Sequence, residues 1–132
     1  MSTANEHRPC SVAPAAAAKS LHSCDLEETR AKVALMFKPH RMQISARAAK
    51  PFSAHITHRP AQRCSINELG YGSAVDIDPG RMETFYLALL PLRGSASIEA
   101  GNERFEVREG VGALITPQAP VRMRWGDDCA MR

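Results

Sequence analysis

A dense apolar run and several alternating segments lie between Glu83 and Trp125. The run FYLALLPL, residues 85–92, is apolar at both parities, which predicts a strand covered on both faces. Residues 95–99, 104–107 and 121–125 alternate apolar and polar side chains, and residues 113–115 form a short apolar segment. Glycine-containing turns separate these segments. The pattern predicts a strand meander with one apolar side, which is half of a small barrel or sandwich.

The earlier part of the chain predicts a tail, one helix and further strands. Residues 1–22, rich in Ala, Ser and Pro, are assigned to a disordered tail. Asp25 caps a helix that ends before Pro39, and Glu28 completes a pair similar to a capping box. Alternating segments then predict strands around residues 42–44, 54–57, 64–69 and 74–77, whereas Asp78-Pro79-Gly80 predicts a turn. One domain, residues 23–132, therefore follows the tail.

Composition and charge narrow the function classes. A chain of 132 residues and 14.4 kDa holds one domain with a modest core. The net charge of +3 comes from scattered Lys and Arg, which favours a mixed solvated surface over a basic nucleic-acid face. The longest apolar run is far shorter than the roughly 18–20 residues that span a bilayer, and the N-terminus lacks a signal-peptide core. We therefore expect a cytoplasmic protein.

Side chains that could carry catalysis or bind a metal are sparse. His55 and His58 stand three residues apart on a predicted strand, so they point to opposite faces and do not form a metal pair. No serine or cysteine lies in a nucleophile motif. The four cysteines form no C-x-x-C pair and are expected to be reduced, with Cys64 as a small core residue. The sequence predicts no catalytic residue, no metal and no cofactor, and hence not an enzyme.

A set of short motifs recurs in a recognisable order. The chain carries DLEETR at 25–30, FKPHRM at 37–42, PLRG at 91–94, VREG at 107–110 and ALITP at 113–117, followed by Pro120. From about Asp25 to Trp125 this order resembles the N-terminal effector-binding domain of AraC/XylS-type transcriptional regulators. The resemblance implies a mainly β, cupin-like barrel or double sheet preceded by one α-helix. It also implies a small-molecule sensor that signals to a C-terminal pair of helix-turn-helix units.

This sequence departs from the resemblance in two respects. The helix-turn-helix units do not follow, so we expect no direct DNA binding by this chain, although full-length relatives bind DNA. The histidines of the enzymatic cupins are also missing, because Gly80 to Gly94 contains none and Val121 follows Pro120. The alternatives are a stand-alone small-molecule-binding or metal-dependent cupin and a non-functional gene fragment.

An effector site is expected among the inward positions of neighbouring strands, with a few polar contacts beside them. The expected site residues are His40, Cys64, Arg81, Phe85, Leu87, Leu89, Ile98, Phe105, Leu114 and Trp125. The alternative is that these side chains fill the interior and leave no cavity. The chain stops at Arg132, within what should be another strand, so the barrel is expected to be incomplete at the C-terminus. The strand from Val121 to Trp125 would then have an unpaired edge, which favours self-association.

Overall fold

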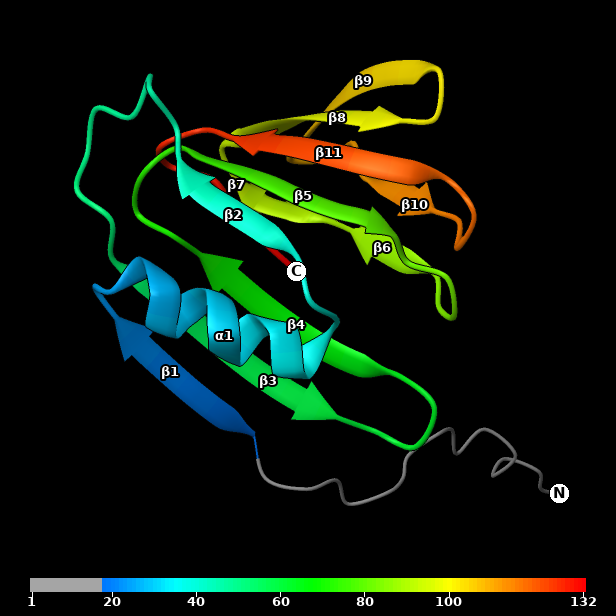
Figure 1. The fold of residues 1–132 in the computed structure, drawn as a ribbon, viewed down its shortest axis with the longest axis horizontal. Coiled ribbons are helices and arrows are strands. Elements are labelled where there is room, and N and C mark those ends of the chain that lie inside the picture. The colour runs from blue at the N-terminus through cyan, green and yellow to red at the C-terminus, as the bar shows by residue number, and fades with distance from the viewer. Residues whose placement is uncertain (1–17) are drawn as a thin grey trace, which may run out of the picture.

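The computed structural model describes residues 18–132, and most of the predicted tail, residues 1–17, lies outside this part of the chain. Its fold is mainly β with one helix in the described residues, and every strand pair is antiparallel. Figure 1 shows two large sheets as layers, without closure into one continuous barrel. The predicted fold class, a cupin-like double sheet preceded by a helix, is confirmed. No helix within residues 18–132 has the length and apolar character needed to cross a membrane.

Each large sheet has five strands. The first has the order β1-β3-β4-β12-β7, with β1 at Lys19–Ser23, β3 at Ala54–Pro60, β4 at Ser65–Gly70, β12 at Ala130–Met131 and β7 at Pro91–Arg93. The second has the order β2-β5-β11-β8-β9, with β2 at Arg41–Ile44, β5 at Val75–Arg81, β11 at Pro120–Trp125, β8 at Ser95–Ala100 and β9 at Glu103–Arg108. A small sheet pairs β10, Ala113–Ile115, with β6, Leu87–Leu89.

The core lies between the layers and follows the alternation of the sequence. On β11, Val121, Met123 and Trp125 are buried and the residues between them are exposed. Ile98 on β8 and Val107 on β9 are fully buried beside them. Burying one such side chain contributes about 1.5–3 kcal/mol to the free energy of unfolding. A shift of one residue would turn every one of these side chains toward solvent, so their burial fixes the register of the strands.

The helix α1, Leu26–Met36, begins where the sequence predicts. The Asp25 side chain accepts from the backbone N–H of Glu28 at 2.8 Å. Glu28 accepts from the Ser23 hydroxyl at 2.6 Å, and Ser23 Oγ accepts from the backbone N–H of Asp25 at 3.0 Å. In a capping box the Glu28 side chain would accept directly from the Asp25 N–H, whereas here the Ser23 hydroxyl lies between the two groups and bonds to both. The helix contacts β1 of one sheet and β2 of the other. Strand β1 includes residues 19–22, which the composition had assigned to the tail.

The expected unpaired edge at residues 121–125 is wrong. Strand β11 lies inside its sheet, with β5 on one side and β8 on the other. The last strand, β12, also pairs on both sides, with β4 and β7. Sequence reasoning placed β11 at the edge because it could not foresee that β5, some forty residues earlier, returns to pair with it. The reason given for self-association therefore no longer holds.

The predicted turn at Asp78-Pro79-Gly80 is also wrong, because these residues continue β5. Val121 pairs with Gly80 and Met123 pairs with Ile77, so Asp78 and Pro79 together face Arg122. This is a β-bulge, in which an extra residue is accommodated by a local bend. Gly80 adopts a positive φ of 69° in this bulge, a conformation that glycine reaches without steric cost. A glycine that suggests a turn in the sequence therefore also suits a bulge.

The apolar run 85–92 is not covered on both faces. It divides into β6 and β7, and Tyr86, Leu90 and Leu92 are exposed. Only the parity of Phe85, Leu87 and Leu89 turns inward, with Leu89 buried and the other two half-buried. In β10, expected as a buried strand, Leu114 is likewise exposed. The reason is that β6 pairs with β10 alone, and nothing in the described chain covers the outer face of this pair.

Candidate functional site

A large cavity of about 1050 Å³ opens between the two sheets. Its volume is that of a site for a small organic molecule. The end of α1, the β3–β4 turn and the β5–β6 connection all contribute to its lining, and Figure 1 shows them at the same end of the molecule. The inner part is apolar, formed by Val33, Met36, Phe37, Leu69, Ile77, Met82, Phe85, Leu87, Leu89, Met123, Trp125 and Met131.

A cluster of three aromatic rings lies beside this cavity, and two of them, Tyr71 and Trp125, line it. Tyr71 lies 5.1 Å from Trp125 and 6.0 Å from Phe52, measured between ring centroids. Burial strongly raises the pKa of Tyr71, so its phenol stays protonated. Trp125 is only 5% exposed, and its indole Nε1–H has no hydrogen-bond partner among the described residues. A buried donor without an acceptor is costly, and this one is enclosed by protein atoms, so the part of Trp125 that lines the cavity is its apolar ring surface.

His40 and Lys38 lie where the chain leaves α1, at the rim of the cavity. His40 Nδ1 lies 3.0 Å from the Lys38 carbonyl, and because a carbonyl oxygen only accepts, Nδ1 donates the proton. Burial, together with the charges of Arg30 and Lys38, lowers the pKa of His40, although its bond to the Lys38 carbonyl opposes the shift. His40 is therefore neutral at pH 7 and keeps an acceptor lone pair on Nε2.

A second polar cluster, formed by His58, Asn67 and Ser65, makes its hydrogen bonds among its own members. His58 Nδ1 hydrogen-bonds to Asn67 Oδ1, and Asn67 Nδ2 donates to the Ser65 hydroxyl at 3.0 Å. His55 lies on the opposite face of β3, as the strand spacing predicts, and its ring stacks on His22 with centroids 4.2 Å apart. Within residues 18–132 no group of three His, Cys, Asp or Glu side chains is arranged to hold a metal ion. The prediction that the protein binds no metal remains to be tested by elemental analysis.

The structure brings part of the predicted site together. Of the ten predicted site residues, six line the cavity: His40, Cys64, Phe85, Leu87, Leu89 and Trp125. The other predicted residues lie elsewhere: Ile98 is fully buried in the core, Phe105 packs against that core from β9, and Leu114 is exposed. Arg81 is also exposed, and its Nε donates to the carbonyl of Gln118 at 2.8 Å.

Cys64 is not the small core residue that the alternation predicts. It is exposed and comes just before β4. The buried positions of that strand are Asn67 and Leu69 instead. Its place on the lining gives the cavity a thiol near solvent.

Several lining residues were missed from the sequence. Tyr71 follows a strand within G-Y-G, a pattern that indicates a turn rather than a buried ring. Lys38 precedes the helix-ending Pro39, and no sequence signal shows that its side chain reaches β5. Asn67 lies in the segment 64–69, whose alternation predicts a strand, but no sequence signal gives the hydrogen bonds of this buried polar residue. Periodicity gives the parity of a residue and not its distant partners, so these roles needed the structure.

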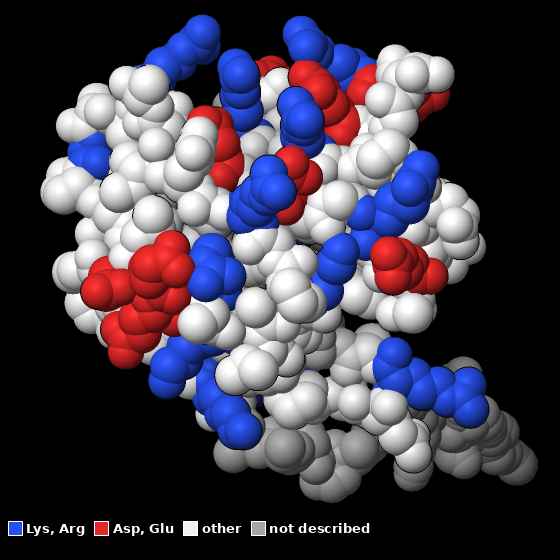
Figure 2. All heavy atoms as spheres, viewed as in Figure 1, with Lys and Arg blue, Asp and Glu red and all other residues white. Residues whose placement is uncertain are grey.

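The outer face of the second sheet carries a different, smaller groove of about 420 Å³. Across the strands, Arg41, Asp78, Arg122, Glu99 and Arg104 follow one another with alternating charge. Figure 2 shows Lys and Arg interspersed with Asp and Glu over the visible face of the molecule. This arrangement is that of a solvated sheet face, without the single-sign field that a phosphate backbone would require.

Comparison with known proteins matches residues 29–131 to the AraC-binding-like domain. No curated protein and no solved structure matches the chain. The match begins within α1 and ends in β12, so it covers most of the chain and every strand of the two large sheets except β1. The resemblance seen in the sequence motifs is thereby confirmed, and all the cavity-lining residues except Arg132 lie within the matched region. The chain belongs to the family of AraC-binding-like domains.

Proposed function

We propose that this chain is the small-molecule-sensing domain of an AraC-type transcription regulator. The observation that carries the proposal is the cavity of about 1050 Å³ between the sheets, apolar inside and polar at its rim. The partner is a small organic effector, and the DNA-binding unit it controls is not among the described residues, which contain a single helix. Association between copies of the chain remains a prediction, without the sheet edge that first suggested it.

The signal would pass through α1. Val33, Met36 and Phe37, at the end of this helix, line the cavity, and the same helix contacts one strand of each large sheet. A ligand that packs against these side chains stabilises one position of α1 relative to the sheets. Such a differential contact is what ligand-controlled switching requires.

A screen of small organic molecules by thermal unfolding tests the proposal. At about 100 times its dissociation constant, a ligand adds about 2.7 kcal/mol to the free energy of unfolding. Leu87→Trp places a large side chain in the lining and should abolish this gain, and its melt without ligand shows whether it folds. Leu92→Trp is the matched control, because Leu92 lies on the neighbouring β7 and does not line the cavity.

Amide hydrogen exchange then tests the coupling. With ligand bound, the amides of α1 should exchange more slowly in the wild type and in Leu92→Trp, but not in Leu87→Trp. A ligand that stabilises Leu87→Trp as much as the wild type would place the binding site elsewhere. Stabilisation without any change in α1 would remove the proposed signal path and leave only binding.

A further inference from the structure

The charged side chains that line the cavity all carry positive charge. They are Lys38, Arg63 and Arg132, and no aspartate or glutamate of the described residues joins them. The outer groove on the second sheet differs, because its arginines are interspersed with Asp76, Asp78 and Glu99. The single sign therefore belongs to the cavity and not to the protein surface in general.

Lys38 is the cation whose charge is fixed in place. Its Nζ donates to the backbone carbonyls of Pro79 and Arg81, at 2.5 and 2.7 Å. These neutral oxygens position the ammonium group without cancelling its charge, and within residues 18–132 no carboxylate forms an ion pair with it. One of its three N–H groups remains for another acceptor. Arg132, in contrast, is already paired with Glu68 at 2.5 Å.

The remaining N–H of Lys38 indicates the kind of ligand. An ammonium group can only donate hydrogen bonds, so a molecule that satisfies it must carry acceptor atoms such as carboxylate oxygens. Trp125 also lines the cavity, but it lies at the other end of β11, beside Val75, and contributes apolar surface.

We propose that the effector is a small organic anion: a carboxylate carried on an apolar body. Lys38 holds the carboxylate, and the aromatic and methionine side chains of the lining contact the body. The inference rests on the proposed function, because it names the ligand class of the same cavity. The charges of Arg30 and Lys38, which act with burial on the pKa of His40, agree with a positive potential at this rim.

Three matched probes test the charge preference: 4-phenylbutyrate, its neutral amide and the corresponding amine. Cys64 lines the cavity and is exposed, so a bound probe should slow its alkylation. Cys24 is also exposed but does not line the cavity, and it serves as the control within each sample. We expect the acid to protect Cys64 with an affinity about tenfold or more above that of the amide, as for a hydrogen bond to a charged group. The amine should bind most weakly.

Variants assign the preference to Lys38. Lys38→Met should reduce the ratio of acid to amide affinity to near one while leaving the amide affinity in place. Lys38→Arg, which keeps the charge, should keep the preference. Lys32→Met is the matched control, because Lys32 is an exposed lysine of α1 outside the lining.

The outcomes separate the two proposals. If acid and amide protect Cys64 equally in the wild type, the cavity binds small molecules but the anion preference is wrong. If the amine binds as tightly as the acid, the preference is also wrong. If none of the probes protects Cys64, the inference fails, whereas the proposed function is judged by its own wider screen. A ratio in Lys38→Met equal to that of the wild type would keep the ligand class and overturn the role of Lys38.

Discussion

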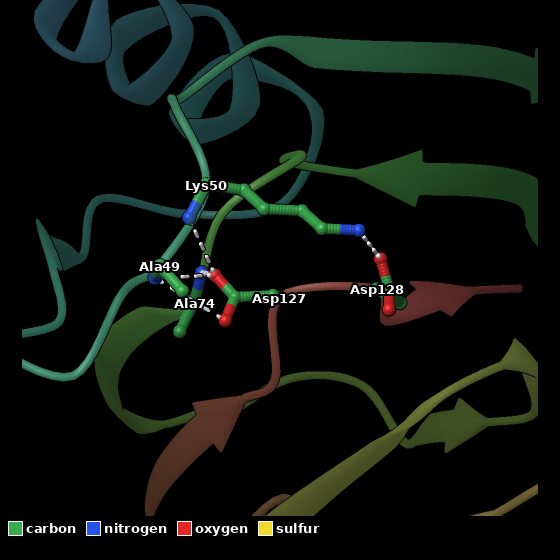
Figure 3. Close-up of polar contacts among 5 residues, drawn as sticks. All are labelled: Ala49, Lys50, Ala74, Asp127 and Asp128. Atoms are coloured by element: carbon green, nitrogen blue, oxygen red, sulfur yellow. Dashed lines mark hydrogen bonds and ion pairs between the residues drawn. The ribbon is translucent and has the colours of Figure 1, made fainter.

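The Asp127 carboxylate accepts a hydrogen bond from the backbone N–H of Ala74 across 3.0 Å. The same carboxylate accepts from the backbone N–H groups of Ala49 and Lys50, at 3.0 and 3.3 Å (Figure 3). These donors come from the segment between β2 and β3 and from the residue before β5, while Asp127 follows β11. One side chain thus ties the connection between the two large sheets to the end of the central strand.

This arrangement predicts a loss of stability in acid. Partial burial opposes ionisation of Asp127, but the hydrogen bonds from Ala49, Ala74 and Lys50 outweigh it and lower the pKa of the carboxyl. A lowered folded-state pKa stabilises the fold above the unfolded value, about 3.9, and that contribution is lost as the pH falls through the folded value. Urea unfolding from pH 7 to pH 2 should therefore show stability falling below about pH 4.

Asp127→Asn should be less stable at pH 7, and its stability should fall less in acid than that of the wild type. Asp128→Asn is the control, because Asp128 makes only an exposed pair with Lys50, and such pairs contribute little. Equal acid profiles for the wild type and Asp127→Asn would contradict this account.

Gly94 is predicted not to accept a side chain, because both its φ and its close contacts oppose one. Its φ is +70°, and a Cβ there would lie 2.7 Å from the backbone Cα of Cys129. Gly101 has a similar φ of +62°, but a Cβ would meet nothing within 4 Å. Gly101→Ala should cost about 1 kcal/mol for backbone strain alone, and Gly94→Ala roughly 3 kcal/mol or more. Equal losses in denaturant unfolding would show that the contact with Cys129 carries no cost.

The described cysteines should differ sharply in reactivity. Burial raises the pKa of the Cys129 thiol to about 11, although Arg93 acts in the opposite direction. At pH 8 about one molecule in a thousand carries the thiolate there, and the side chain is also shielded. Iodoacetamide should modify Cys24 and Cys64 in the native protein and reach Cys129 only on unfolding, as followed by peptide mass spectrometry. Native alkylation of Cys129 at the rate of Cys24 would contradict this burial.

Binding to duplex DNA should be weak and independent of sequence. The net charge of +3 and the mixed charges of Figure 2 support few phosphate contacts, and the described residues contain one helix, where a helix-turn-helix needs two. A gel-shift assay at ~150 mM salt checks this expectation. Submicromolar affinity for one sequence over a scrambled one would overturn it.

Much of the fold could be predicted because its signals are local. The alternation at residues 121–125 gives the buried face of β11, and Asp25 marks the start of α1 through the N–H groups that a helix leaves unpaired. The inward parity of Phe85, Leu87 and Leu89 was likewise predicted, although the cover on their outer face was not.

The remaining features depend on partners distant in sequence. The turn residues at 78–80 form a bulge only because β11 pairs with them, and Cys64 leaves the core only because β4 begins one residue later. Lys38 reaches the carbonyls of β5 across some forty residues of chain. No periodicity encodes such contacts, so the cavity and two of its polar residues, His40 and Cys64, could be proposed from the sequence, but the roles of Lys38 and Asn67 could not.

The most direct test of the account is the indole N–H signal of Trp125 in a ¹H–¹⁵N NMR titration. The chain contains one tryptophan, so this signal is unambiguous. With 4-phenylbutyrate, or with a ligand from the thermal screen, the account predicts a saturable shift of the indole signal together with amides of β6 and the end of α1. A saturable shift confined to the outer face of the second sheet, at Arg122 and Arg124, with the indole signal unmoved, would contradict it.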